Sequence, residues 1–229
     1  MHLMDGMDWQ ALALSASLAI ATALILMPLA VCVARWLATS TQLLKPVVEA
    51  LIALPLVLPP TVLGYYLLVG MGGGSTLGAL FERVTGQPLA FSFSGLLLAS
   101  IVFNVPFAMM PVLRAFEAIP ADLFDAARTC GLSRWQTLFK VELPLAWRGI
   151  LSGLIMTVAH TLGEFGVVLM VGGSIPGETK TIAISIYDKV QSFELQAAGA
   201  MAATLLTISL AALLATAWLA RGRPTAARG

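Results

Sequence analysis

The chain has 229 residues, of which 59% are hydrophobic and 11% are charged, and its formal net charge is +1. A soluble domain usually holds about 45–50% apolar and about 25% charged residues, so the composition excludes an ordinary soluble domain and indicates an integral membrane protein. The small net charge without a basic cluster excludes a nucleic-acid partner, and two cysteines and two histidines scattered along the chain predict neither a metal site nor a disulfide framework.

Five apolar segments are long enough to cross a lipid bilayer, which takes about 20 helical residues for about 30 Å of hydrocarbon. The predicted fold class is therefore an all-α integral membrane protein with five transmembrane helices. Residues 11–220 form one transmembrane domain, residues 1–10 precede it, and residues 221–229 form a short polar tail. The predicted spans are residues 11–34, 47–69, 94–116, 149–171 and 196–220.

The second span contains three prolines, Pro55, Pro59 and Pro60. Proline removes a backbone donor and clashes with the preceding turn, and lipid offers no partner for the carbonyl that is freed. We expect a kinked helix whose proline-rich part faces other helices or a transport path. An ordinary proline kink without a role in transport is the alternative.

The distribution of Lys and Arg predicts the orientation in the membrane, because cytoplasmic segments carry an excess of both. With the N-terminus outside, ten of the 13 Lys and Arg residues lie on the cytoplasmic side. The remaining three are Arg83, Lys180 and Lys189. We therefore expect a periplasmic N-terminus and a cytoplasmic C-terminal tail in the inner (plasma) membrane.

Residues 120–144 are the longest charged run between two spans, and they are placed in the cytoplasm. Pro120 suits the start of a helix, and Gly131 can end it in the left-handed conformation. Ser133 then caps a second short helix, with Gln136 completing a capping box. The pattern predicts two short helices outside the bilayer, joined by a glycine turn.

The first of these helices carries small residues, Ala126 and Ala127, which allow another surface to approach its backbone closely. A helix that only rested on lipid headgroups would favour larger apolar residues together with Lys or Arg. The segment is therefore expected to dock into a partner. A hairpin that merely covers the end of the bundle is the alternative.

The same segment resembles the conserved cytoplasmic loop of ABC importer permeases, Glu-Ala-Ala, three residues, Gly, nine residues, Ile, one residue, Leu-Pro. This chain has Asp for Glu and Val for Ile at the same spacing. In that family the loop is the coupling helix, which sits in a groove of a cytoplasmic ATPase. The matching residues are Asp125, Ala126, Ala127, Gly131, Val141, Leu143 and Pro144.

A second stretch, residues 160–188, contains GEFGVVLMVGG followed by IPGETKT and is similar to molybdate permeases. The resemblance covers about residues 11–220 and implies the type I ABC importer fold. It also implies a homodimer with two cytoplasmic ATP-binding cassette subunits and a periplasmic molybdate-binding protein. ATP and Mg would be bound by the ATPase, with no cofactor in this chain. Tungstate or sulfate/thiosulfate import is the alternative within transport.

The stretch GGSIPGETKT has Gly172 and Gly177 at the spacing of a phosphate-binding loop. However, Glu178 and Thr179 follow the second glycine, where the motif requires Lys and then Ser or Thr. Since the chain has no other nucleotide-binding motif, ATP hydrolysis is assigned to a partner, and the chain itself is predicted not to be an enzyme.

Two ionisable residues, His160 and Glu164, lie one helical turn apart within the fourth predicted span. An acid at membrane depth usually faces a cavity or a partner, so the two could pair and hold a gate, or simply form a structural hydrogen bond within the bundle. An intramembrane enzyme that uses both is a remote alternative. Asn104, beside Pro106 in the third span, is expected to replace the hydrogen bond that this proline removes.

Overall fold

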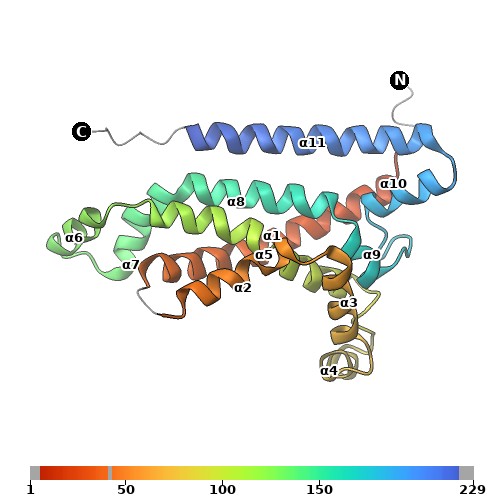
Figure 1. The fold of residues 1–229 in the computed structure, drawn as a ribbon, viewed down its shortest axis with the longest axis horizontal. Coiled ribbons are helices and arrows are strands. Elements are labelled where there is room, and N and C mark those ends of the chain that lie inside the picture. The colour runs from red at the N-terminus through yellow and green to blue at the C-terminus, as the bar shows by residue number, and fades with distance from the viewer. Residues whose placement is uncertain (1–5, 41–42, 222–229) are drawn as a thin grey trace.

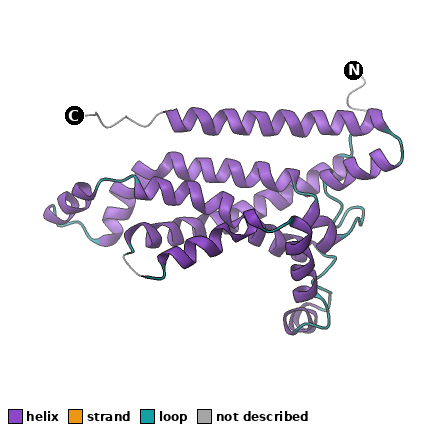
Figure 2. Ribbon diagram, in the orientation of Figure 1, coloured by secondary structure: helices purple, strands orange, loops and turns teal. Residues whose placement is uncertain are grey.

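The computed structural model describes residues 6–40 and 43–221, and these residues form eleven α-helices and one π-helix, without a strand (Figures 1 and 2). Residues 1–5 of the predicted N-terminal segment and residues 222–229 of the predicted tail lie outside the described residues. In chain order the elements are α1 (Trp9–Thr39), α2 (Lys45–Val57), α3 (Pro60–Met71), α4 (Thr76–Thr85), α5 (Phe93–Glu117), α6 (Ala121–Thr129), α7 (Arg134–Thr137), the π-helix η1 (Leu138–Glu142), α8 (Leu143–Gly163), α9 (Gly166–Gly172), α10 (Ile182–Gln191) and α11 (Leu195–Arg221).

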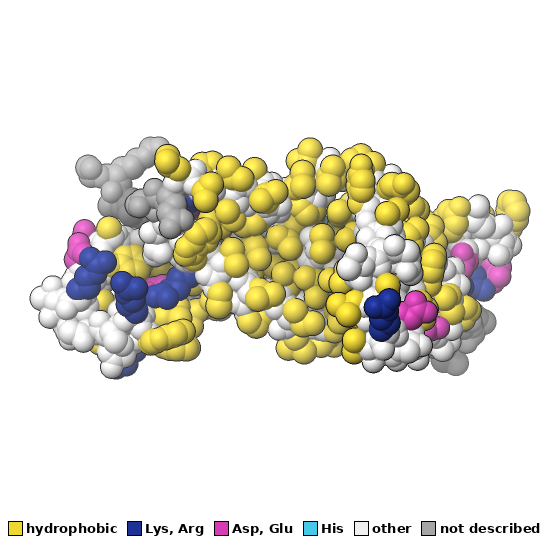
Figure 3. Space-filling view, turned by 90° about the horizontal axis from the view of Figure 1, so that it is seen from below, with side chains coloured by type: hydrophobic (Ala, Val, Ile, Leu, Met, Phe, Trp, Pro, Cys, Tyr) yellow, Lys and Arg dark blue, Asp and Glu magenta, His cyan; other side chains and the backbone are white. Residues whose placement is uncertain are grey.

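The long helices α1, α5, α8 and α11 run along the length of the molecule and form the bundle (Figure 1). Within the described residues, four continuous helices are long and apolar enough to cross a membrane, and the bent pair of α2 and α3 supplies a fifth candidate. The surface agrees, because on the face shown in Figure 3 apolar side chains cover the middle, while Lys, Arg, Asp and Glu gather towards the two ends. The predicted all-α fold with five transmembrane segments is confirmed.

The second predicted span, residues 47–69, is broken rather than kinked. Helices α2 and α3 meet at an angle of 107°. Leu58 and Pro59 both have extended backbone, and Pro60 starts α3 where a missing N–H costs nothing. Two successive prolines cannot continue the hydrogen-bond ladder of α2, so the kinked helix expected over residues 47–69 is instead two separate helices.

The fourth predicted span, residues 149–171, is also interrupted. Helix α8 ends at Gly163, and α9 begins at Gly166. Glu164 lies in the break with extended backbone, and its Oε1 accepts a hydrogen bond from the N–H of Val167 at 2.7 Å. The carboxylate thus satisfies a free donor at the start of α9, as capping residues do. The sequence pattern had placed Glu164 within one continuous span, whereas it lies between two helices.

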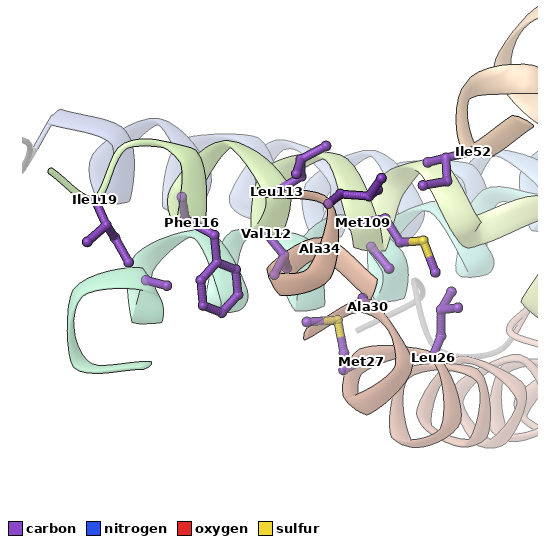
Figure 4. Close-up of a cluster of buried hydrophobic side chains, with 14 of the residues drawn as sticks. Leu26, Met27, Ala30, Ala34, Ile52, Met109, Val112, Leu113, Phe116 and Ile119 are labelled. Atoms are coloured by element: carbon purple, nitrogen blue, oxygen red, sulfur yellow. The ribbon is translucent and has the colours of Figure 1, made fainter. Parts of the chain in front are cut away.

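The largest buried cluster lies at the interface of α1, α2 and α5, with η1 and α8 adding side chains. Figure 4 shows Ala30 and Ala34 of α1 close to Val112 and Phe116 of α5. Small side chains on α1 let the two helices approach, and the larger side chains of α5 fill the remaining space. Close packing of this kind holds membrane helices together, because lipid tails are as apolar as the side chains.

Helices α5 and α8 approach most closely at two glycines of α8, Gly149 and Gly153. A Cβ atom at Gly149 would overlap the Cβ of Ala115, and one at Gly153 would lie 2.7 Å from the carbonyl oxygen of Ala108. That oxygen belongs to a helix backbone and cannot rotate away. The two glycines therefore set the distance between the two helices.

A Gly153→Ala variant is expected to destabilise the folded protein by about 1–3 kcal/mol, because the added methyl group must push α5 and α8 apart. Thermal unfolding in detergent micelles measures the effect. Gly163→Ala, on the same helix with no atom within 4 Å of the added carbon, is the matched control and should keep the wild-type Tm. Equal Tm values for the two variants would contradict the close approach.

Candidate functional site

Helices α6 and α7 form a separate feature at one end of the bundle, joined by a tight turn (Figure 1). Helix α6 starts after Pro120 and has Asp122 in its first turn, where a negative charge is favourable to the helix dipole. Gly131 has φ +73°, and the N–H of Leu132 reaches back to the carbonyl oxygen of Ala127 at 3.0 Å. The predicted helix, glycine turn and helix are therefore present.

The start of α7 has the predicted capping box. The N–H of Gln136 donates to the Ser133 hydroxyl oxygen at 3.3 Å, and the side-chain oxygen of Gln136 accepts from the N–H of Ser133 at 2.9 Å. Two free donors are thus satisfied reciprocally. Trp135 and Phe139 stack with ring centroids 6.4 Å apart and are both exposed, so an aromatic pair lies on the surface beside α6.

The two alanines of α6 face in different directions. Ala126 is exposed, whereas Ala127 is only 6% exposed. Asp125 is exposed and lies 3.5 Å from Arg128 of the same helix. A surface that docks onto α6 would therefore meet Asp125 and Ala126, while Ala127 belongs to the internal packing of the segment. The sequence pattern had grouped the two alanines on one accessible face.

Leu143 and Pro144 lie where the segment of α6, α7 and η1 enters α8. The N–H of Leu143 bonds to the carbonyl oxygen of Leu138, five residues back, which closes a π-helical turn. Pro144 has no N–H to bond one turn back, so the regular α-helical ladder is interrupted at this position. The Leu-Pro pair thus shapes the junction through which α7 and η1 continue into α8.

A Gly131→Val variant is expected to destabilise the turn between α6 and α7, because left-handed backbone costs a residue with a Cβ about 1–2 kcal/mol, and more when it is β-branched. No atom lies within 4 Å of a Cβ at this position, so the effect is one of backbone conformation and not of space. Thermal unfolding of the purified protein in detergent measures the effect. Gly131→Asn is the matched control, because Asn tolerates this conformation, and equal losses in both variants would contradict the argument.

A buried polar network crosses the bundle and connects α1, α5 and α8. The Thr22 hydroxyl donates to Ser100 Oγ at 2.9 Å, and Asn104 Nδ2 donates to the carbonyl oxygen of Ser100 at 2.8 Å. The His160 ring nitrogen Nδ1 lies 3.2 Å from Asn104 Oδ1. Since Asn104 uses its amide nitrogen as the donor, its oxygen accepts, and His160 donates from Nδ1.

For His160, the structure has the hydrogen bond within the bundle that was the second alternative; for Asn104, it corrects the expectation. His160 pairs with Asn104 across the interface of α5 and α8, and not with Glu164; its ring stacks on Phe107 with centroids 3.6 Å apart. The Asn104 amide group donates to Ser100, so it does not restore the bond that Pro106 removes. The partner of His160 lies on another helix, and the partner of Asn104 lies one turn earlier on its own helix.

His160 and Glu164 nevertheless border the same cavity of about 270 Å³ between α8 and α11. Glu164 is held at its edge by the hydrogen bond to Val167. The cavity combines two ionisable side chains with a hydroxyl group and apolar walls. Its lining residues are Met156, Ala159, His160, Gly163, Glu164, Ser209, Ala212 and Leu213.

The arrangement defines a class of protein, a helical membrane bundle with a short helical hairpin at one end and a polar cavity between its helices. Residues 27–223 match the profile of the family described as "Binding-protein-dependent transport system inner membrane component". The chain belongs to this family. It is an inner-membrane permease subunit of a binding-protein-dependent ABC transporter, a transport component and not an enzyme, so the intramembrane-enzyme alternative is set aside.

Within this family, the chain is similar to permeases of two kinds of transport system, molybdenum and sulfate. The chain is 42% identical to the molybdenum transport system permease protein ModB of Azotobacter vinelandii over 91% of this chain and 92% of that protein. It is 37% identical to ModB of Escherichia coli K12 over 93% and 94%. It is 33% identical to the sulfate transport system permease protein CysW of Synechococcus elongatus, over 76% of this chain and 61% of that protein.

Among solved structures, a bacterial alginate ABC transporter in complex with a periplasmic protein matches with a TM-score of 0.67. The match covers 92% of this chain and 76% of that chain at 16% sequence identity. A similarity at this level of identity concerns the fold alone. It confirms the ABC importer fold that the resemblance in sequence implied.

Proposed function

We propose that this chain is the permease subunit of a molybdate importer, which moves the anion across the inner membrane by alternating access. The observation that carries the proposal is the 37–42% identity to molybdenum permeases over more than 90% of this chain, against 33% over 76% for a sulfate permease. Tungstate and sulfate/thiosulfate remain the alternative substrates. These anions share charge and approximate shape with molybdate, so the binding protein selects among them.

The proposed assembly is a homodimer with two ATP-binding cassette subunits on the cytoplasmic side and a molybdate-binding protein on the periplasmic side. The end that carries α6 and α7 is placed in the cytoplasm, which puts the N-terminus outside and the C-terminus inside. The excess of Lys and Arg in the segments at this end supports the orientation. The ATPase supplies the bound ATP and Mg.

In this assembly α6 is the coupling helix. Asp125 and Ala126 offer an exposed, small-residue surface, and Gly131 holds the turn that returns the chain to α7. Ala127 packs inward, and Leu143 and Pro144 form the junction with α8. Movement of the ATPase subunits would thereby reach the membrane helices through a short, well-defined connection.

The cavity beside His160 and Glu164 is the proposed gate region. His160 is fixed by Asn104 and the two neighbouring phenylalanine rings, and Glu164 occupies the break between α8 and α9. A break allows α9 to move without distorting α8, because the two helices share no ladder hydrogen bond across it. Glu164 is not proposed as an anion ligand, since like charges repel at short range.

The substrate assignment is tested by ATP hydrolysis in the reconstituted complex. Binding protein loaded with molybdate is expected to stimulate hydrolysis several-fold, while the same binding protein in sulfate alone is expected to leave the rate at its basal value. Equal stimulation by the two anions would replace molybdate with a broader class of oxyanions. Stimulation by tungstate at the level of molybdate would be consistent with the shared geometry of the two ions.

A further inference from the structure

One arginine of α1 holds both ends of the segment that connects α6 to α8. Arg35 Nε donates to Glu142 Oε2 at 2.6 Å, and Arg35 Nη2 donates to Glu142 Oε1 at 2.8 Å. The same Nη2 lies 3.3 Å from the carbonyl oxygen of Arg134. Arg134 is the first residue of α7, and Glu142 is the last residue of η1. A single guanidinium group therefore spans residues 134–142.

Two properties hold Arg35 and Glu142 together: the two-point hydrogen bonding of the guanidinium and the burial of the carboxylate. A guanidinium that donates to both oxygens of a carboxylate fixes distance and orientation together, which a single donor does not. Glu142 is only 1% exposed, although it is charged. A carboxylate at that depth is costly without its partner, so separating Arg35 from Glu142 is strongly unfavourable and the two residues stay together.

Helix α6 meets the bundle through Phe124, which packs against the largest buried cluster. A cavity of about 400 Å³ lies beside α6, lined by Thr39 at the end of α1, by Phe116 of α5, and by Asp125 and Glu142. Along the chain, α6 connects to α5 through residues 118–120 and to α8 through α7 and η1. Helix α1 is not adjacent in sequence to this segment; Leu37 of α1 and Leu138 of η1 share the largest buried cluster, and the Arg35 contact adds a charged and directional link between the two elements.

We infer that Arg35 and Glu142 are positioning residues for energy coupling, which make α1 move together with α7, η1 and α8 when the ATPase displaces α6. The inference rests on the proposed function of α6 as the coupling helix. Without the ion pair, a displacement of α6 would move α8 relative to α1. The movement would then not be passed on to α1. ATP would then be hydrolysed without a matching movement of the whole bundle.

The double variant Arg35→Met/Glu142→Leu tests the inference. Well-packed apolar residues commonly replace a buried ion pair without loss of stability, so this variant should fold and bind the ATPase. It removes the fork on the carboxylate and the contact with Arg134. Arg35→Lys is a second variant, which keeps the charge but cannot donate in the same fork. Lys189→Met/Glu194→Leu is the matched control, because it removes a 2.6 Å ion pair at the opposite end of the molecule.

The first measurement is the number of ATP molecules hydrolysed per anion taken up by the complete transporter in vesicles. We expect this ratio to rise about tenfold in the double variant, a coupling change within the usual range for linked sites. Arg35→Lys should raise it to a smaller extent, and the control should keep the wild-type value. An unchanged ratio in the double variant, with normal assembly, would reduce the pair to a structural role and overturn the inference.

The second measurement does not depend on the identity of the anion. Spin labels at Trp36 and Lys140, both exposed, report the distance between α1 and η1 after replacement of Cys32 and Cys130 by serine. With the ion pair intact, the distance should be the same with and without ATP, whereas in the double variant it should change on ATP binding. If molybdate uptake failed but this distance behaved as expected, the proposed substrate would be wrong and the inference would stand. A constant distance in the double variant would overturn it.

Discussion

An Ala126→Trp variant is expected to fold and insert into the membrane, but to lose binding of the ATPase and, with it, uptake. Ala126 is the exposed small residue of α6, and an indole there would hold a docking surface away from the helix backbone. Disruption at the centre of an interface commonly costs 2 kcal/mol or more, which weakens binding by about 30-fold. Co-purification of the ATPase with the permease, followed by titration of the complex, measures the change.

Ala121→Trp is the control for this variant. Ala121 is exposed on the same helix, but five residues at 100° each place it on the side away from Ala126. It should bind the ATPase nearly as well as the wild type. Equal losses for the two variants would mean that bulk anywhere on α6 is harmful, and wild-type binding by Ala126→Trp would show that this face is not the docking surface.

An Asn104→Asp variant is expected to destabilise the bundle more than any other single change proposed. Asp has nearly the shape of Asn, but its carboxylate would lie against the Ser100 carbonyl oxygen, where the amide nitrogen now donates at 2.8 Å. Asn104 is fully buried, and a charged residue at the centre of a membrane helix costs about 3 kcal/mol. Thermal unfolding in detergent should show a large fall in Tm.

Asn104→Leu separates the effect of charge from the effect of lost hydrogen bonds. It leaves His160 without its partner and removes the side-chain donor to Ser100, which costs about 1–3 kcal/mol for unsatisfied buried groups, but it introduces no charge. We expect Asp to lower Tm more than Leu, and both to lower it below the wild type. If Asp and the wild type unfolded at the same temperature, the network through Asn104 would not contribute to the stability of the bundle.

The parts of the structure that sequence predicted well are those encoded by local chemistry. The Ser133 cap, its Gln136 partner and the left-handed turn at Gly131 depend on residues within a few positions of one another. The five membrane segments follow from apolar length, which lipid thickness dictates. Composition alone thus set the fold class, and local spacing alone predicted the helical hairpin of α6 and α7.

The breaks in the second and fourth segments were harder to foresee. Three prolines signalled a disturbance in the second segment, but not the 107° angle between α2 and α3, which requires extended backbone at two successive residues. In the fourth, Gly163 and Gly166 flank Glu164, and glycines on both sides of an acid that can cap a helix are a signal that could have been recognised.

The contacts that carry the proposed mechanism join residues far apart in the chain. Arg35 and Glu142 are separated by 107 positions, and Asn104 and His160 by 56. Periodicity places each residue on a helix, but it does not predict which helices pack together or at which position along their axes they meet. Pairing of His160 with Glu164 was one of two alternatives because the two lie one turn apart; the partner that His160 has is Asn104 on α5.

The most direct test of the central claim is transport by the reconstituted complex. The permease, its ATPase and its binding protein are placed in vesicles, and labelled molybdate is followed with and without ATP in the presence of excess sulfate. The account predicts accumulation that requires both ATP and the binding protein and that sulfate does not abolish. Uptake of equal size without ATP would contradict the role of α6 as a coupling helix and, with it, the account of this chain as an ATP-driven importer subunit.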